Sequence, residues 1–109
     1  MVAAIIEQNK DEIAALCRTY RIRALWVFGS AVTEAFDPEQ SDLDFLVDLG
    51  DYSDDYASRF FTLRRELERV TGRDVDLVSA GGPESGWFRE EVEATKVSVY
   101  DARYDQLVA

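Results

Sequence analysis

The 109-residue chain contains no histidine and one cysteine. Without histidine, it can have neither a catalytic triad with an imidazole base nor a zinc site with imidazole ligands. Cys17 has no partner for an internal disulfide, and its helical spacing with apolar neighbours indicates a buried side chain that takes part in no chemistry. Bases are scarce as well: twelve Lys and Arg stand against twenty-two Asp and Glu, for a formal charge of −10. That sign opposes direct binding of DNA or RNA through phosphate contacts.

Long hydrophobic runs are also missing. The apolar run Val2–Ile6 is too short for a signal-peptide core, has no basic leader and is followed at once by Glu7. We therefore expect a cytoplasmic protein with no membrane segment. The composition is 47% hydrophobic and includes thirteen aromatic residues, which is enough to form a core. At this length we expect residues 1–109 to form one domain.

Hydrophobic spacing predicts alternating helices and strands. Asn9 and Glu12 have the spacing of a helix cap, Ser53 can cap a second helix, and Gly72 is typical of a helix end. Short runs rich in β-formers, bounded by turn residues, indicate strands. The predicted elements are a helix from Asn9 to about Arg21, strands at 22–28 and 42–48, a helix at 56–70, a strand at 74–78, a loop at 81–86 and a helix at 87–95.

Three aspartates occupy strand positions, where apolar side chains are the rule: Asp42, Asp44 and Asp76. Residues two apart on a strand point the same way, so Asp42 and Asp44 repel each other by roughly 2 kcal/mol at an effective dielectric constant near 20. Oxygen ligands without His or Cys suit a hard cation such as Mg²⁺. The alternative is that these carboxylates are simply solvated at a strand end.

Gly29 and Ser30 end the first predicted strand. A glycine at such a turn allows the backbone to approach a ligand closely, and exposed N–H groups beside a hydroxyl can bind a phosphate. Together with the three strand aspartates, the turn predicts a site in which one element binds a triphosphate and carboxylates bind the metals that neutralise it.

Three segments carry a family resemblance: residues 25–30 (Leu-Trp-Val-Phe-Gly-Ser), 41–47 (Ser-Asp-Leu-Asp-Phe-Leu-Val) and 75–78 (Val-Asp-Leu-Val). They resemble the minimal nucleotidyltransferases of the DNA polymerase β superfamily, over roughly residues 10 to 104. The resemblance implies a fold of the α/β (α+β) class. In this fold, a small mixed β-sheet has helices packed on one side.

The resemblance also implies roles for individual residues. Gly29 and Ser30 would contact the nucleotide phosphates, and Asp42 and Asp44 would bind two Mg²⁺ ions. Asp76 would complete the metal site and accept the proton of the acceptor hydroxyl. Asp74 shares a face with Asp76 and remains the alternative third carboxylate.

The implied reaction is transfer of a nucleoside monophosphate, AMP from ATP, to a hydroxyl group. Members of the family serve as antitoxins paired with small helical HEPN toxins, and the acceptor is then a tyrosine of the toxin. An acidic chain complements such a basic, RNA-cutting partner. Because the chain is short, acceptor recognition would come from this partner or from a homo-oligomer.

One departure from the family pattern bears on activity. Family members commonly carry an arginine three positions after the serine, whereas this chain has Thr33. Arg59 and Arg64 on the following helix are candidate substitutes, and the alternative is that both are simply solvated on a helix face. The alternatives are therefore an inactive antitoxin that acts by binding alone, or transfer to a small hydroxylated molecule such as an aminoglycoside. Val97 and Tyr100, in a tail resembling the family's last segment, are expected to pack in the core.

Overall fold

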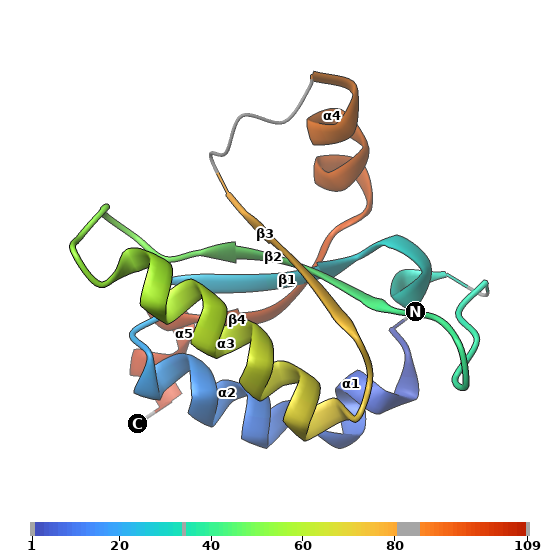
Figure 1. Cartoon of the computed structure of the whole chain (residues 1–109), viewed down its shortest axis with the longest axis horizontal. Coiled ribbons are helices and arrows are strands. Elements are labelled where there is room, and N and C mark those ends of the chain that lie inside the picture. The colour runs from blue at the N-terminus through green and yellow to red at the C-terminus, as the bar shows by residue number, and fades with distance from the viewer. Residues whose placement is uncertain (1, 34, 81–85, 109) are drawn as a thin grey trace.

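The computed structural model describes residues 2–33, 35–80 and 86–108 (Figure 1). Within these ranges, helices and strands alternate along most of the chain. The elements are α1 (Ala4–Gln8), α2 (Lys10–Thr19), β1 (Ala24–Phe28), the 3-10 helix η1 (Gly29–Val32), β2 (Leu43–Asp48), α3 (Tyr56–Thr71), β3 (Val75–Ser79), α4 (Gly86–Thr95), β4 (Val97–Asp101) and α5 (Ala102–Val108).

The four strands form one mixed sheet in the order β3-β2-β1-β4. β1 pairs antiparallel with both β2 and β4. β2 and β3 run parallel, and α3 forms the connection between them. The predicted α/β class with a small mixed sheet is confirmed. The expectation that all helices pack on one side holds for α2 and α3 but not for α4, because Val92 packs on the opposite face with Phe28 and Leu46.

The two faces of the sheet are covered differently. Leu43, Phe45 and Val47 of β2 are fully buried in a core that also contains Leu63 and Leu67 of α3. Asp44 and its alternate neighbours point to the other face, as the strand period requires. Figure 1 shows α2 and α3 below the sheet and α4 standing above it. A smaller cluster under α4 is formed by Phe28, Leu46 and Val92.

α3 forms where the sequence predicts it, but its start is different. We expected Ser53 to cap the helix. Instead the Ser53 hydroxyl donates to the Asp55 carboxylate at 2.6 Å, and Asp55 stands at the N-cap without a capping bond of its own. The helix begins at Tyr56, two residues later than a cap at Ser53 would place it, so Ser53 lies outside the capping position. Gly72 ends the helix in the left-handed conformation with φ 69°, as predicted.

β1 starts at Ala24 and not at Ile22, the predicted start. Arg21 adopts a left-handed φ of 57°, and the Ile22 N–H bonds back to the Cys17 carbonyl at 2.8 Å. These two residues therefore belong to the turn that ends α2, although Ile22 is buried as expected.

The sequence missed two elements and one detail. α1 and β4 were not predicted, and the Asn9 side chain donates to the Ile5 carbonyl of α1 where we expected it to cap α2. Val97 and Tyr100 pack against the main core, which confirms their predicted role.

The predicted loop at 81–86 falls mostly outside the described residues. No helix among the described residues is long and apolar enough to cross a membrane.

Candidate active site

The strand pairing brings two of the predicted acids together. In the parallel register of β2 and β3, Asp44 is the direct partner of Asp76. In the antiparallel register of β1 and β2, Asp44 is also the partner of Phe28, the residue before Gly29. Asp44 therefore lies between the third strand and the glycine-serine turn, which are 46 residues apart in the sequence.

Gly29 and Asp44 are in direct contact. Gly29 has a φ of 72°, which disfavours other residues, and a side-chain carbon added to it would overlap the Asp44 carboxylate. The carboxylate carbon would then lie only 3.2 Å from that added atom. Glycine is needed here for both its backbone conformation and its lack of a side chain. A ligand at the turn would consequently lie beside this carboxylate.

The electrostatics of Asp44 reflect its acidic neighbours. Burial, the charge of Asp76, a hydrogen bond with Asp76 and the charge of Asp42 together raise the pKa of Asp44 to about 6. Asp42 and Asp76 are exposed and Asp44 is half-buried. Asp76, unlike Asp74, is the register partner of Asp44 and acts on its pKa.

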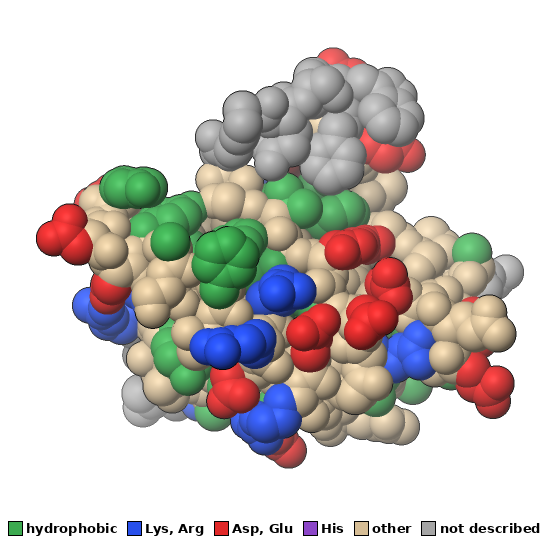
Figure 2. Space-filling model, in the orientation of Figure 1, with side chains coloured by type: hydrophobic (Ala, Val, Ile, Leu, Met, Phe, Trp, Pro, Cys, Tyr) green, Lys and Arg blue, Asp and Glu red, His purple; other side chains and the backbone are tan. Residues whose placement is uncertain are grey.

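These acids have the chemistry of a site for a hard cation. Their donors are all carboxylate oxygens, and a bound cation would offset the burial and the acidic neighbours that raise the pKa of Asp44. Among the described residues, no group of three or more Asp, Glu or Cys side chains is close enough together to hold a metal ion as it stands. The case for a cation site therefore depends on the Asp44–Asp76 pair and on the nearby charge of Asp42. Figure 2 shows Asp and Glu side chains gathered over the region of β2 and β3.

A cavity of about 440 Å³ adjoins the turn. It opens between η1 and α4, on the sheet face to which Asp44 points. The sequence predicted its Gly29–Ser30 side but not the residues of α4, because no local motif marks them. The described lining consists of Phe28, Gly29, Ser30, Thr33, Glu91, Val92 and Thr95.

Thr33, which stands where the family commonly has arginine, stabilises the turn. Its hydroxyl donates to the Ser30 carbonyl at 3.0 Å and accepts from the Ala35 N–H at 3.1 Å. The Ser30 hydroxyl itself has no hydrogen-bond partner among the described residues, so it is available to a ligand.

The suggested substitute cations do not serve this site. Arg59 is only 11% exposed and donates to the carbonyls of Tyr20, Arg21 and Leu49. It therefore fixes the loops around α3, and its proposed role at the phosphates is wrong. Arg64 also belongs to α3, which packs on the face of the sheet opposite Asp44.

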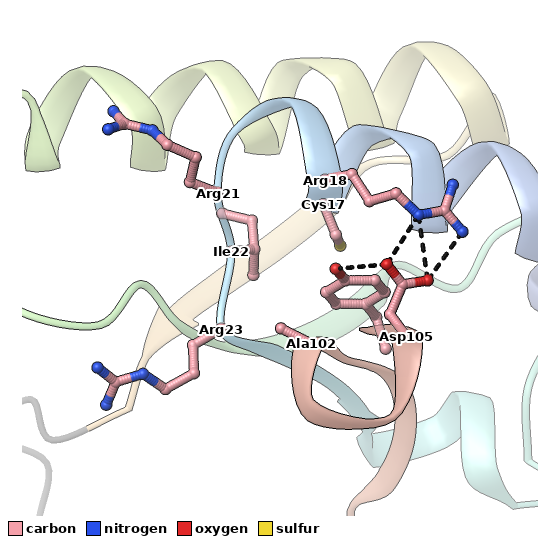
Figure 3. Close-up of a pocket in the computed structure, with 8 residues that line it drawn as sticks. Cys17, Arg18, Arg21, Ile22, Arg23, Ala102 and Asp105 are labelled. Carbon is pink, nitrogen blue, oxygen red and sulfur yellow. Dashed lines mark hydrogen bonds and ion pairs between the residues drawn. The ribbon is translucent and has the colours of Figure 1, made fainter. Parts of the chain in front are cut away.

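A second hollow, of about 410 Å³, lies at the far end of β1 (Figure 3). Its arginines are paired: Arg18 forms a two-pronged contact with Asp105 at 3.0–3.1 Å, and Arg21 pairs with Asp55 at 2.5 Å. Cys17 is fully buried, which confirms the predicted buried side chain, and this burial raises the pKa of its thiol to about 12. The hollow is lined by Cys17, Arg18, Arg21, Ile22, Arg23, Tyr100, Ala102 and Asp105.

Comparison with known proteins supports one family. The model of the family described as "Polymerase beta, Nucleotidyltransferase" matches residues 11–105. A solved structure provisionally named as a minimal nucleotidyltransferase shares 27% identity, with a TM-score of 0.71 over 89% of this chain and 95% of that one. No curated protein sequence matches the chain.

Toxin–antitoxin complexes share the fold. One contains a tri-AMPylated HEPN toxin of Shewanella oneidensis with an MNT antitoxin; the match has 21% identity and a TM-score of 0.63 over 94% of this chain and 78% of that one. Another is a toxin–antitoxin structure with AMP-PNP, at 22% identity and a TM-score of 0.66 over 92% and 79% of the two chains.

Proposed function

Because the chain belongs to the polymerase beta nucleotidyltransferase family, we propose that it transfers AMP from ATP to a hydroxyl group. The observation that carries this proposal is the contact of Asp44 with both Gly29 and Asp76. It places a candidate phosphate-binding turn beside a pair of carboxylates that repel each other.

In this reaction, a bond forms between the acceptor oxygen and the α-phosphorus of ATP. The bond from that phosphorus to the oxygen bridging the β-phosphorus breaks, and pyrophosphate leaves. Ser30 donates its hydroxyl to a phosphate oxygen, and Gly29 leaves room for the phosphates because it has no side chain. Asp76, whose side chain is exposed, accepts the proton of the acceptor hydroxyl.

Asp42, Asp44 and Asp76 are the residues that would hold Mg²⁺. Bound there, Mg²⁺ would neutralise charge on the phosphates and lower the pKa of the acceptor hydroxyl. The half-buried position of Asp44 fixes the ligand set relative to the turn, while the exposed position of Asp76 leaves room for an acceptor.

The proposed acceptor is a tyrosine of a HEPN toxin, which would make the chain an antitoxin. The support is the shared fold with the MNT antitoxin complexes, one of which contains an AMPylated toxin. The net charge of −10 also favours a basic protein partner.

A second candidate is an antitoxin that neutralises by binding alone. The observation in its favour is the cavity beside Ser30, whose described lining contains no lysine or arginine. In the position of the usual arginine, the hydrogen bonds of the Thr33 hydroxyl to described residues stay within its own turn.

The test co-expresses this chain with a candidate HEPN partner and analyses that partner by mass spectrometry. Each transferred AMP should add about 329 Da to the HEPN protein. Asp76→Asn should abolish the added mass without preventing complex formation, and Asp74→Asn is the matched control because Asp74 is exposed just before the same strand. A partner without added mass that is still fully neutralised by Asp76→Asn would establish the binding-only function.

A further inference from the structure

We propose that the cavity between η1 and α4 is the nucleoside subsite of this enzyme, with Glu91 as its specificity-determining residue. This inference deepens the proposed function and rests on it. The cavity shares Gly29 and Ser30 with the phosphate turn, so a nucleotide bound at the turn extends directly into it. Its volume of about 440 Å³ is in the range of small-molecule pockets.

The lining decides which part of the nucleotide enters the cavity. Glu91 is the one charged side chain among the described lining residues, and a carboxylate repels the β- and γ-phosphates. Phe28 and Val92 add apolar surface, and both are more than nine-tenths buried. The α4 side of the cavity, with its apolar floor and one acceptor carboxylate, therefore fits a base and a ribose, while the phosphates stay at the Gly29–Ser30 turn.

The Glu91 carboxylate is available for such a contact. Among the described residues it forms no side-chain hydrogen bond and no ion pair; its backbone carbonyl accepts from Thr95 within the helix. A carboxylate only accepts hydrogen bonds, so its ligand must supply N–H or O–H donors. The hydroxyls of ribose and the exocyclic amine of adenine are such donors.

α4, which forms one wall of the cavity, contacts the sheet at two places. Val92 packs between Phe28 and Leu46. At the end of the helix, the Lys96 ammonium lies 4.3 Å from the centre of the Trp26 ring and pairs with Glu93 at 2.8 Å. These contacts tie α4 to β1 and β2, the strands that present Gly29 and Asp44.

The experiment measures binding of two probes by calorimetry in the presence of Mg²⁺: ATP and inorganic tripolyphosphate, which has the phosphates without the nucleoside. Glu91→Ala should weaken ATP binding about tenfold, through the loss of one charge-assisted hydrogen-bonded contact, and should not weaken tripolyphosphate binding. Glu90→Ala is the matched control, since Glu90 is exposed on the same helix and does not line the cavity. It should change neither affinity.

The outcomes separate the subsite from the proposed function. If wild-type protein binds ATP and Asp44→Asn weakens that binding, but Glu91→Ala binds ATP like wild type, the nucleoside lies elsewhere and only the subsite is overturned. Equal weakening of both probes by Glu91→Ala would also overturn it. If the wild-type chain binds neither probe, the proposed function fails and the subsite fails with it. A loss of ATP affinity without a loss of UTP affinity would assign Glu91 to the base amine; equal losses would assign it to the ribose.

Discussion

Replacing Asp44 with asparagine should stabilise the metal-free protein at alkaline pH. The pKa of Asp44 is raised from 3.8 to about 6, so the folded state binds its proton more tightly than the unfolded state does. A shift of about two units corresponds to roughly 3 kcal/mol. Because the side chain is only half-buried, solvent screening reduces this to about 1 kcal/mol.

The sign of the effect depends on pH. Stability arising from the raised pKa is fully present below about pH 3.8 and is lost as the pH rises through about 6. At pH 8 the ionised Asp44 therefore destabilises the wild-type fold, and asparagine, which cannot ionise, removes that penalty. Near pH 4 most of the difference should vanish.

Urea unfolding followed by tryptophan fluorescence, at pH 8 and pH 4 with a chelator present, measures this difference in the free energy of unfolding. Asp51→Asn is the control, since Asp51 is exposed in the loop after β2 and should change stability by less than about 0.5 kcal/mol. Adding Mg²⁺ at pH 8 should stabilise wild type more than Asp44→Asn. Our account of the site would be refuted if Asp44→Asn were less stable than wild type at pH 8, or equally stabilised at both pH values.

Three further substitutions or treatments test other parts of the structure. Gly29→Ala should destabilise the fold by about 2 kcal/mol or more, because Gly29 has a positive φ and the added methyl group would overlap Asp44. The loss of stability should be smaller in an Asp44→Ala background. Additive losses in this double-mutant cycle would contradict the contact between the two residues. Arg59→Ala should lower the free energy of unfolding by about 2 kcal/mol, because it removes the donor to three backbone carbonyls. Arg65 is exposed on the same helix, so Arg65→Ala should lower the free energy of unfolding by less than about 0.5 kcal/mol in the same urea titration. Cys17 should react with a thiol reagent at pH 8 only after unfolding in urea, and rapid labelling of the native protein would show that the thiol is not buried.

The sequence predicted the elements whose residues carry a local signal. The spacing of apolar residues in α3 and the alternation in β2 were sufficient because each pattern matches one period of secondary structure. β4 was missed because it depends on long-range pairing with β1, interrupted by an irregularity between Leu25 and Trp26. α1 has only five residues, too few to show a helical period.

The candidate site divides in the same way. Gly29, Ser30 and the three aspartates could be proposed from the sequence because Asp is unusual within a strand and because all five residues lie in the segments that resemble the family. The Asp44–Asp76 register follows from the parallel pairing of β2 and β3, which the sequence does not specify. The α4 side of the cavity depends on how Val92 packs over Phe28 and Leu46, a tertiary contact with no local pattern.

The position of β3 has a consequence for substrate size. β3 is the outermost strand of its side of the sheet, and it carries Asp76 with an exposed side chain. In the proposed transfer, a reaction at this edge strand would set no upper limit on the size of the acceptor molecule, because only one hydroxyl would have to reach Asp76. Selection among acceptors must then come from surfaces away from the reacting atoms. A few surface substitutions could therefore redirect such an enzyme to another acceptor without altering Gly29, Asp44 or Asp76.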